Sequence, residues 1–358
     1  MNSNILVSII INNYNYDRFL AEAIDSALNQ SYDNIEVIVV DDGSTDNSRQ
    51  IIAQYGDCDP RRRHRIIPIL QPNGKQAAAF NSGFAKSKGE IIIFLDSDDY
   101  LFPQAVEEIV AVWRPNLAKV HYRLNVVDAV GKSLGYSSPQ GTAPLSSGQV
   151  WRMLLEVGGY VSTPTSGNAL NRQALIELFP IPDRYKLTAD DYLSFQVPFY
   201  GEVVAIEQPL GVYRVHDSNQ WALATVTGDR FKRFVRHDLE NLDLLTKKAK
   251  ELGYQIPADL EQRSIGRLWS RIISLRLNDR NHPVKSDRSL QLIYQGIRSL
   301  WKYSDFSFLK RIFYSLWFVW VGLMPLPLAK PAISWLFAPH KRPKLVNWTT
   351  TKLRVLMN

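Results

Sequence analysis

The sequence predicts an α/β protein with a mostly parallel sheet, helices on both faces of that sheet, and a helical C-terminal extension. Short β-branched runs alternate with amphipathic helical patterns over the first hundred residues. Acidic turns follow two of these runs, and the chain becomes basic and strongly helical after about residue 230. Strands that alternate with helices form right-handed crossovers, and these build a parallel sheet.

The elements are expected in the following order. A buried strand over residues 7–12 is β-branched and ends at the turn-like NNYNYD. Asp17 can cap the next helix, which has one apolar face formed by Phe19, Leu20, Ala23, Ile24, Ala27 and Leu28. Further strands are expected over residues 35–40, 65–70 and 91–95, and further helices from Asp46 or Ser48 and over residues 76–86. Beyond about residue 115 short strands and helices are mixed.

The composition is that of an ordinary globular protein, with 45% hydrophobic and 22% charged residues among 358. Cys58 is the single cysteine, which excludes an intrachain disulfide and fits a reducing compartment. The apolar run over residues 5–11 is too short for a signal peptide and lacks a cationic region before it. We therefore expect a cytoplasmic protein.

Charge is distributed unevenly along the chain. Residues 229–358 contain 24 Lys and Arg against 10 Asp and Glu, a net charge of +14, whereas the first 228 residues contain 18 against 25, a net charge of −7. A basic C-terminal region predicts an anionic surface as a partner, and a solvated basic helix face is the alternative. We expect two domains, an α/β domain over residues 1–228 and a basic helical region over residues 229–358.

Asp96 and Asp98 directly follow a predicted buried strand. A carboxylate pair where a strand ends can present oxygen ligands to Mg²⁺ or Mn²⁺, which share their coordination sphere readily with substrate phosphates. Such an ion neutralises a diphosphate leaving group. The alternative is an acidic turn that only ends the strand, since aspartates are common in turns.

Asp41 and Asp42 end another predicted strand and are followed by Gly43 and Ser44. Acidic residues at this place hydrogen-bond ribose in dinucleotide-binding folds, and a plain turn before a helix cap is the alternative. Ligands of such sheets bind outside the carboxyl ends of the strands, so both acidic pairs are expected at one edge.

Two long segments resemble the family 2 glycosyltransferases. These are VSIIINNYNYDRFLAEAIDSALNQSYDNIEVIVVDDGSTDNS and NGKQAAAFNSGFAKSKGEIIIFLDSDD, and their spacing and order are similar to those of the family over the first hundred residues. The resemblance continues more weakly through Gly167-Asn168, Asp190-Asp191 and Tyr213-Arg214-x-His216. It implies the GT-A fold, a Rossmann-like mostly parallel sheet. It also implies that residues 1–228 are the catalytic domain, with a nucleotide-sugar part over about 1–115 and an acceptor part over about 116–228.

The resemblance also implies roles for particular residues. It places the nucleotide near Asn13, Asp41 and Asp42, the donor near Lys75, and the donor and metal motif at Asp96, Ser97 and Asp98. It implies a catalytic base at Asp191, where Asp190 replaces the common Glu before it and is the rival base. His216 matches a position that completes the metal site or touches the diphosphate in some members, and a satisfied surface histidine is the alternative.

The function implied by the resemblance is metal-dependent transfer of a sugar, with inversion, from a nucleotide-diphospho-sugar to an acceptor hydroxyl. We expect a UDP-sugar donor, Mn²⁺ or Mg²⁺ as cofactor, and a role in polysaccharide or glycolipid synthesis in the cell envelope. Two alternatives are a nucleotidyltransferase, which usually has a glycine-rich basic phosphate loop that residues 12–15 lack, and a catalytically inactive sugar-binding protein. The identity of the sugar depends on the surroundings of Gly167-Asn168 and on residues 127–148.

Residues 312–329 are uncharged, rich in Trp and Phe, and preceded by Lys310 and Arg311. Spanning a bilayer needs about 20 apolar residues, and Pro325 and Pro327 interrupt this run. We therefore expect a segment over about 312–338 that lies on a membrane, assisted by Lys341, Arg342 and Lys344, with a buried helix as the alternative. The expected location is peripheral, on the inner face of the plasma membrane, with a sugar or lipid-linked acceptor and no nucleic acid as partner.

Overall fold

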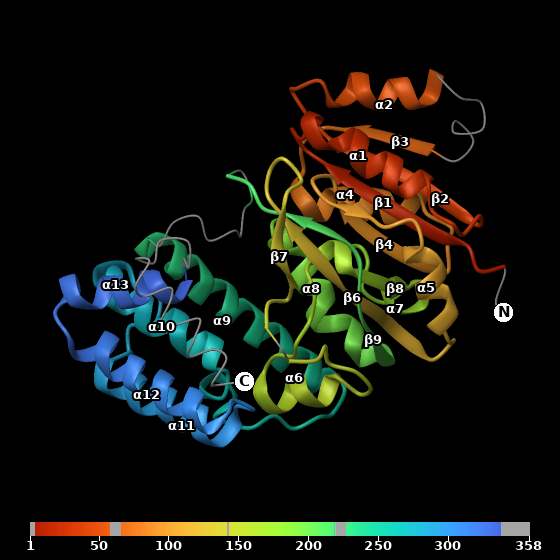
Figure 1. Cartoon of the computed structure of the whole chain (residues 1–358). Coiled ribbons are helices and arrows are strands. Elements are labelled where there is room, and N and C mark those ends of the chain that lie inside the picture. Colours follow the sequence, from red (N-terminus) through yellow and green to blue (C-terminus); the bar gives the residue numbers. More distant parts are fainter. Residues whose placement is uncertain (1–3, 58–65, 142, 218, 220–226, 338–358) are drawn as a thin grey trace. The chain divides into compact units, whose positions relative to one another are not determined.

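The computed structural model describes residues 4–57, 66–141, 143–217, 219 and 227–337, and its helices and strands are labelled in Figure 1. Cys58 and the basic residues Lys341, Arg342 and Lys344 lie outside these ranges. The chain divides into two compact units, residues 1–151 with 160–216, and residues 152–159 with 217–358. Unit 1 contains all the residues expected to act on the sugar. The predicted boundary at residue 228 stays a prediction.

Unit 1 is built around a nine-stranded sheet. Its strands are β1 (Val7–Asn13), β2 (Ile35–Asp42), β3 (Ile66–Gln71), β4 (Ile91–Asp96), β5 (Tyr100–Leu101), β6 (Leu117–Val127), β7 (Ser133–Ser138), β8 (Asn168–Asn171) and β9 (Glu202–Arg214). The order is β3-β2-β1-β4-β8-β6-β9-β5, with β7 paired to β6. The β1–β2, β2–β3, β1–β4 and β6–β9 pairs are parallel, and β5, β7 and β8 run antiparallel to their neighbours. Six of the nine strands therefore point the same way, which confirms the mostly parallel sheet.

The helices of unit 1 follow the alternation predicted from the sequence. They are α1 (Asp17–Leu28), α2 (Ser48–Asp57), α4 (Lys75–Lys86), α5 (Ala105–Val112), α7 (Arg172–Ile176) and α8 (Ala189–Gln196), and the short helix α6 (Trp151–Val157) lies where the chain passes to unit 2. All six residues of the predicted apolar face of α1 are buried.

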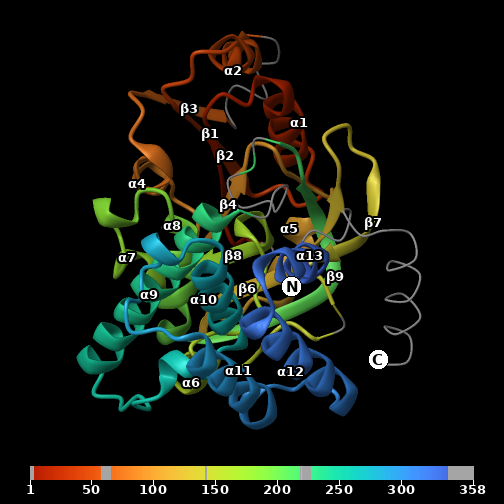
Figure 2. The same cartoon turned by 90° about the vertical axis from the view of Figure 1, so that its left-hand side faces the viewer.

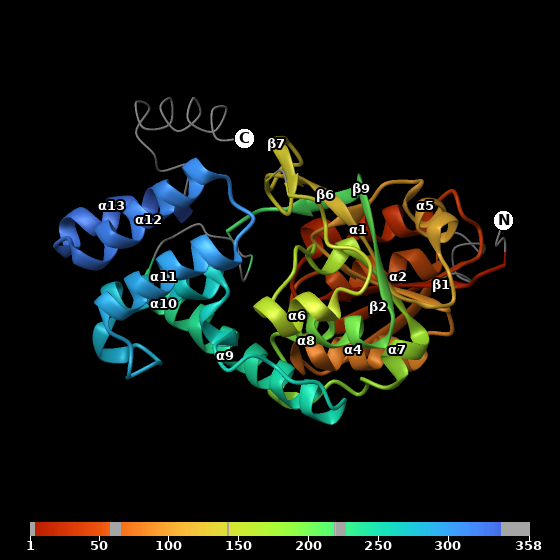
Figure 3. The same ribbon diagram turned by 90° about the horizontal axis from the view of Figure 1, so that it is seen from below.

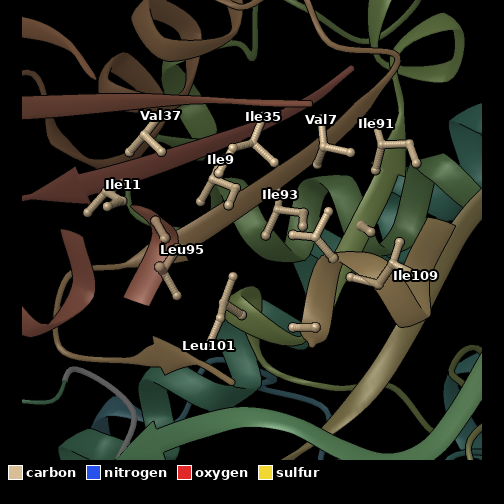
Figure 4. Packing of buried hydrophobic residues seen from close by; sticks show 14 of the residues in the cluster. Val7, Ile9, Ile11, Ile35, Val37, Ile91, Ile93, Leu95, Leu101 and Ile109 are labelled. Atoms are coloured by element: carbon tan, nitrogen blue, oxygen red, sulfur yellow. The ribbon is translucent and has the colours of Figure 1, made fainter. Parts of the chain in front are cut away.

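The two faces of the sheet are covered by different helices. Residues 7, 9 and 11 of β1 pack with Leu20 of α1, Ile52 of α2 and Ile109 of α5 in one core cluster, part of which is seen in Figure 4. Gly83 of α4 lies on the opposite face, where an added Cβ would come 2.3 Å from Ile10 Cγ2. The helix can approach the sheet this closely only because residue 83 is glycine. Helices therefore cover both faces, as predicted.

One local prediction is wrong. Asp17 does not cap α1, because its carboxylate accepts hydrogen bonds from the backbone and side-chain amides of Asn47, at 3.2 and 3.1 Å. The Asp17 N–H instead donates to Asp46 Oδ2 at 2.9 Å, and Asp46 also accepts from the N–H of Ser48 at the start of α2. The two aspartates cross-link the loops before α1 and α2, a tertiary arrangement that local spacing does not reveal.

Unit 2 is a helical bundle formed by α9 (Gly228–Glu251), α10 (Ile265–Leu277), α11 (Ser289–Tyr303), α12 (Phe308–Leu323) and α13 (Leu326–Phe337). Its core contains Phe231, Leu268, Ile272, Trp317 and Phe318 among others. The uncharged stretch of the sequence is thus divided between α12 and α13, and part of it packs inside the bundle. In the part of the chain described, no helix is long and apolar enough to cross a bilayer.

Candidate active site

The carboxyl ends of β1, β2 and β4 meet at one edge of the sheet. Asn13 lies opposite Asp41 in the register of β1 and β2, and Asn12 lies opposite Asp96 in that of β1 and β4. Asn13 Nδ2 donates to Asp41 Oδ1 at 3.2 Å, and Asn12 Nδ2 donates to Asp96 Oδ1 at 2.8 Å. The two acidic pairs therefore lie along the same edge, as the alternation of strands and helices predicts.

Asp41 and Asp42 have different surroundings. Asp41 is fully buried and accepts from Asn13, the N–H of Ser44 and the Arg49 guanidinium, the last at 2.9 Å. Asp42 accepts the backbone N–H groups of Gly74 and Lys75 at 2.9 and 2.8 Å. Both carboxylates thus fix the loops that surround the expected nucleotide position. Fixed loops of this kind preorganise a ligand site.

Lys75 is the first residue of α4 and lies at the same edge. Its backbone φ is +73°, a left-handed conformation that a non-glycine residue rarely adopts. Its ammonium lies 5.6 Å from the centroid of the exposed Tyr14 ring. A lysine and a helix N-terminus at this place would both attract a diphosphate.

The loop after β4 is a cluster of interacting carboxylates. Burial, with the neighbouring Asp98 as the next cause, raises the pKa of Asp96 to about 6. Burial also raises the pKa of Asp99 well above its ordinary value, with Asp98 and Asp96 contributing. Asp99 accepts from Ser166 Oγ at 2.6 Å and from the N–H of Arg214 at 2.9 Å. Ser166 Oγ accepts from the N–H of Asp96 at 3.1 Å, so it holds both ends of the loop.

His216 is brought to this loop, as the sequence predicts, and is buried there. Its Nε2 lies 2.9 Å from Asp98 Oδ2, and its Nδ1 lies 3.2 Å from a guanidinium nitrogen of Arg18. Arg18 can only donate, so Nδ1 is the acceptor and Nε2 carries the proton that Asp98 accepts. In this arrangement His216 orients Asp98. Its role as a metal ligand stays a prediction.

The donor set at this edge fits a hard divalent cation. Asp98 contributes to the raised pKa values of Asp96 and Asp99, so a cation among these carboxylates would offset their repulsion. Carboxylate oxygen is the ligand that Mg²⁺ and Mn²⁺ prefer. Within the described ranges no three His, Cys, Asp or Glu side chains already form a ligand group. That is compatible with Mg²⁺-type sites, which use one or two carboxylates and complete their sphere with water and substrate phosphates.

Buried polar atoms at the edge that have no hydrogen-bond partner within the described part of the protein include Asn12 Oδ1, Asn13 Oδ1 and Ser97 Oγ. The sequence analysis places Asn13 and Ser97 at the donor. A buried polar atom without a partner costs about 1–3 kcal/mol, so a polar ligand here would recover that free energy.

A cavity of about 110 Å³ lies within unit 1, on the face of the sheet that α4 and α8 cover, and its lining residue Thr165 also hydrogen-bonds Asp96 of the acidic loop. Its lining includes Asp190, Asp191, Thr165 and Asn168. Figure 3 shows α8 beside α4, from which Phe80 contributes a wall of the same cavity. Asp190 and Asp191 both lie in the first turn of α8, so the helix start allows both to face the cavity. Thr165 Oγ1 donates to Asp190 Oδ2 at 3.2 Å.

Lys119 is a lining residue that the sequence analysis did not single out. Its side chain is fully buried, and its ammonium donates to Tyr160 Oη at 2.9 Å and to Ser162 Oγ at 3.0 Å. A lone lysine in a strand carries no sequence signal, because only the pairing of β6 with β8 places Lys119 beside Leu170 and the cavity. Ser166 and Arg18 likewise carry no signal in their own segments, and only tertiary contacts bring them to the acidic loop and to His216.

His121, two residues further along β6, predicts how the stability of unit 1 changes at acid pH. It is fully buried, and its Nε2 lies 2.8 Å from the carbonyl oxygen of Ser146. Burial, followed by the charge of Lys119, lowers its pKa to about 3. Below about pH 6.5 the unfolded chain takes up a proton at this residue while the folded chain does not. Stability is therefore retained above pH 6.5 and lost progressively as the pH falls towards 3.

The measurement is urea unfolding at several pH values for the natural chain and for His121→Gln. The slope expected from this one residue is up to about 1.4 kcal/mol per pH unit between those limits. His121→Gln should flatten the acid limb, and the comparison at pH 7.5, where His121 is neutral in both states, supplies the baseline. An unchanged acid limb in the variant would show that His121 is not the group responsible.

Residues 8–137 match the family described as Glycosyl transferase family 2. The chain belongs to the family 2 glycosyltransferases. A glycosyltransferase of Nostoc sp., alr2836, is 38% identical over 216 residues, which are 60% of this chain and 66% of the relative. The chain spans about two thirds or less of the length of the curated relatives it matches.

Two solved glycosyltransferases share the fold. Residues 1–349 of S. aureus TarS, solved with UDP-GlcNAc, superpose with a TM-score of 0.52 at 16% identity, covering 92% of this chain and 88% of TarS. The mannosyltransferase PcManGT of Pyrobaculum calidifontis, solved with GDP-Man and Mn²⁺, gives a TM-score of 0.52 at 16% identity, covering 99% of this chain and 86% of PcManGT. The GT-A fold expected of a family 2 glycosyltransferase is confirmed.

Proposed function

We propose that this glycosyltransferase moves a sugar from a nucleotide-diphospho-sugar, foremost a UDP-sugar, to an acceptor hydroxyl, with inversion at the anomeric carbon. One observation carries the proposal. Asn13, Asp41 and the carboxylates of the Asp96 loop lie along one edge of the sheet, and Asp190 and Asp191 line a cavity beside that loop. TarS and PcManGT were solved with UDP-GlcNAc and GDP-Man, which supports a nucleotide-sugar donor.

In this proposal Asp96 and Asp98 hold a divalent cation, Mn²⁺ or Mg²⁺, and PcManGT was solved with Mn²⁺. The ion would neutralise the charge that develops on the leaving diphosphate. Asn13 and the loops fixed by Asp41 and Asp42 receive the nucleotide, Ser97 offers a hydroxyl to the donor, and Lys75 lies where a diphosphate oxygen can accept from its ammonium.

Asp191 is the proposed base. Its carboxylate takes the proton from the acceptor hydroxyl as the oxygen forms a bond to the anomeric carbon. The bond from that carbon to the diphosphate breaks at the same time, and the nucleoside diphosphate leaves with the electron pair. Attack on the side opposite the leaving group inverts the configuration. Asp190, which accepts from Thr165, is the rival base.

The acceptor is proposed to be a sugar or a lipid-linked sugar of the cell envelope, reached from the cytoplasmic face of a membrane on which the protein lies peripherally. The uncharged Trp- and Phe-rich sequence around α12 supports this location.

The experiment is a panel of nucleotide-sugars incubated with the protein and Mn²⁺, with release of nucleoside diphosphate as the readout. One UDP-sugar should be consumed in preference to its GDP and TDP counterparts, and EDTA should suppress the release. Reaction of a nucleoside triphosphate with a sugar 1-phosphate, in which the triphosphate releases pyrophosphate as the nucleotide-sugar forms, would support the nucleotidyltransferase alternative instead. Tight sugar binding without turnover of any donor would support an inactive binding protein.

A further inference from the structure

Helices α11 and α12 of unit 2 carry a continuous exposed apolar surface, here called the α11/α12 face. On α12 its members are Phe308, Leu309, Ile312, Phe313, Leu316, Trp320 and Leu323, and on α11 they are Leu290, Tyr294 and Trp301. Several are largely exposed, for example Leu290 at 71% and Leu316 at 65%. Single exposed apolar residues are normal on soluble proteins, but ten on two neighbouring helices are not.

The spacing of these residues gathers them on one side of each helix. At 100° per residue, the seven residues of α12 fall within an arc of about 140°, and the three of α11 fall within about 40°. The opposite side of α12, including Trp317, Phe318 and Val321, is buried in the bundle. Helix α12, which contains most of the uncharged stretch, therefore has apolar residues on both sides. One side is buried in the core of the bundle, and the other side is exposed.

The two exposed stripes adjoin. Figure 2 shows α11 and α12 side by side, and the Trp301 and Phe308 rings contact edge to face with centroids 5.6 Å apart. Trp301 Nε1 donates to Ser315 Oγ of α12 at 3.2 Å, which fixes the ring between the two helices. The α11/α12 face thus includes α11, which precedes the uncharged stretch. Hydropathy alone does not predict that α11 belongs to this surface.

The charges around this face select its occupant. Residues 289–337 contain Arg298, Lys302, Lys310, Arg311 and Lys330 but a single acidic residue, Asp305. Lys302 and Lys330 are exposed. A second copy would bring one basic surface against another. Residues 338–358 contain five Lys or Arg and no Asp or Glu, so the chain's own end carries the same charge. An anionic lipid surface complements it.

We propose that the α11/α12 face docks in the plane of a bilayer rich in anionic lipids, with its Trp, Phe and Leu side chains at the level of the headgroups. The 16 residues of α12 extend about 24 Å, so the helix lies along the interface and does not cross the bilayer. Trp and Tyr are the side chains that favour this interfacial level. Docking would bring the glycosyltransferase to a lipid-linked acceptor. This role of the docking rests on the proposed function, whereas the docking itself is inferred from the exposed residues and the charges.

The test is sedimentation of the full chain with vesicles of phosphatidylcholine alone and of phosphatidylcholine with phosphatidylglycerol. Binding is expected to the second kind only, with a blue shift of tryptophan fluorescence as Trp301 and Trp320 leave water. The double variant Phe313→Glu/Leu316→Glu should weaken binding by roughly a hundredfold or more, since two apolar anchors are lost. Lys302→Ala should weaken it by roughly fivefold and more at low salt than at high salt.

A matched control is Leu252→Glu/Tyr254→Glu, which adds the same two carboxylates at an exposed leucine and an exposed aromatic residue of unit 2 outside the face. It should bind vesicles like the natural chain. Thermal unfolding shows whether each variant folds. The proposal fails if the natural chain ignores both kinds of vesicle, if the double variant binds as well as the control, or if Phe313→Glu/Leu316→Glu converts a dimer to a monomer. It also fails if vesicles bind only after removal of residues 338–358, because those residues would then cover the face. Vesicle binding needs no sugar transfer, so its failure would contradict the membrane location but not the sugar transfer that we propose.

Discussion

Replacing Asp191 by Asn is expected to abolish sugar transfer while leaving the donor bound. Asn keeps the shape of the side chain but cannot take a proton, and loss of a general base costs roughly 10²- to 10⁴-fold in rate. The donor should remain bound because the residues proposed to hold it lie at the edge formed by β1, β2 and β4, whereas Asp191 is in the first turn of α8. Turnover under saturating donor and calorimetric binding of the UDP-sugar with Mn²⁺ give the two readouts.

Asp190→Asn is the matched control, one residue away in the same turn and lining the same cavity. The amide oxygen of Asn can still accept from Thr165 Oγ1, so Asp190→Asn should change turnover much less than Asp191→Asn does. Near-normal turnover in Asp191→Asn together with an inactive Asp190→Asn would exchange the two roles. If neither variant loses activity, neither carboxylate is the base.

Asp98→Asn is expected to lower turnover by roughly a hundredfold or more and to weaken donor binding in the presence of Mn²⁺. Neutralising the leaving diphosphate supplies several kcal/mol, and each 1.4 kcal/mol is a factor of ten in rate. Without Mn²⁺ the natural chain and Asp98→Asn should bind the donor about equally weakly. Calorimetry with and without Mn²⁺ therefore separates a metal ligand from a residue that only supports the fold.

Asp33→Asn supplies the control for the Asp98 prediction. It also removes one carboxylate of unit 1, from an exposed loop position before β2, at the end of that strand away from Asp41. Its activity and its Mn²⁺ response should match those of the natural chain. Full activity of the natural chain in EDTA would contradict a metal at Asp98.

The order of the elements in unit 1 follows from the sequence because each signal is local. Buried parallel strands are continuous β-branched runs, and the helices between them have apolar residues at helical spacing. The carboxyl ends of parallel strands meet at one edge of a sheet, so the sequence alone predicts that Asp41 and Asp96 lie along the same edge. The prediction that Asp17 caps α1 was wrong because Asn47, 30 residues away, donates to the Asp17 carboxylate, and Asp46, 29 residues away, accepts the Asp17 N–H.

The remainder of the site depends on pairings that sequence spacing does not contain. The pairing of β6 with β8 brings Lys119 to the site, the loop before β8 brings Ser166, and the start of α1 brings Arg18. Each of them is an ordinary residue in its own segment. The α11/α12 face is another case, since hydropathy marks α12 but the partnership of Trp301 with Phe308 appears only in the fold.

The most direct test of the central account is a nuclear magnetic resonance time course of the reaction with the preferred α-linked UDP-sugar, Mn²⁺ and an acceptor sugar. Single displacement by an acceptor oxygen that loses its proton to Asp191 predicts a product that appears first as the β-anomer, at the rate at which the donor disappears. A product that keeps the α configuration, or a donor that remains intact across the whole panel, would contradict the account.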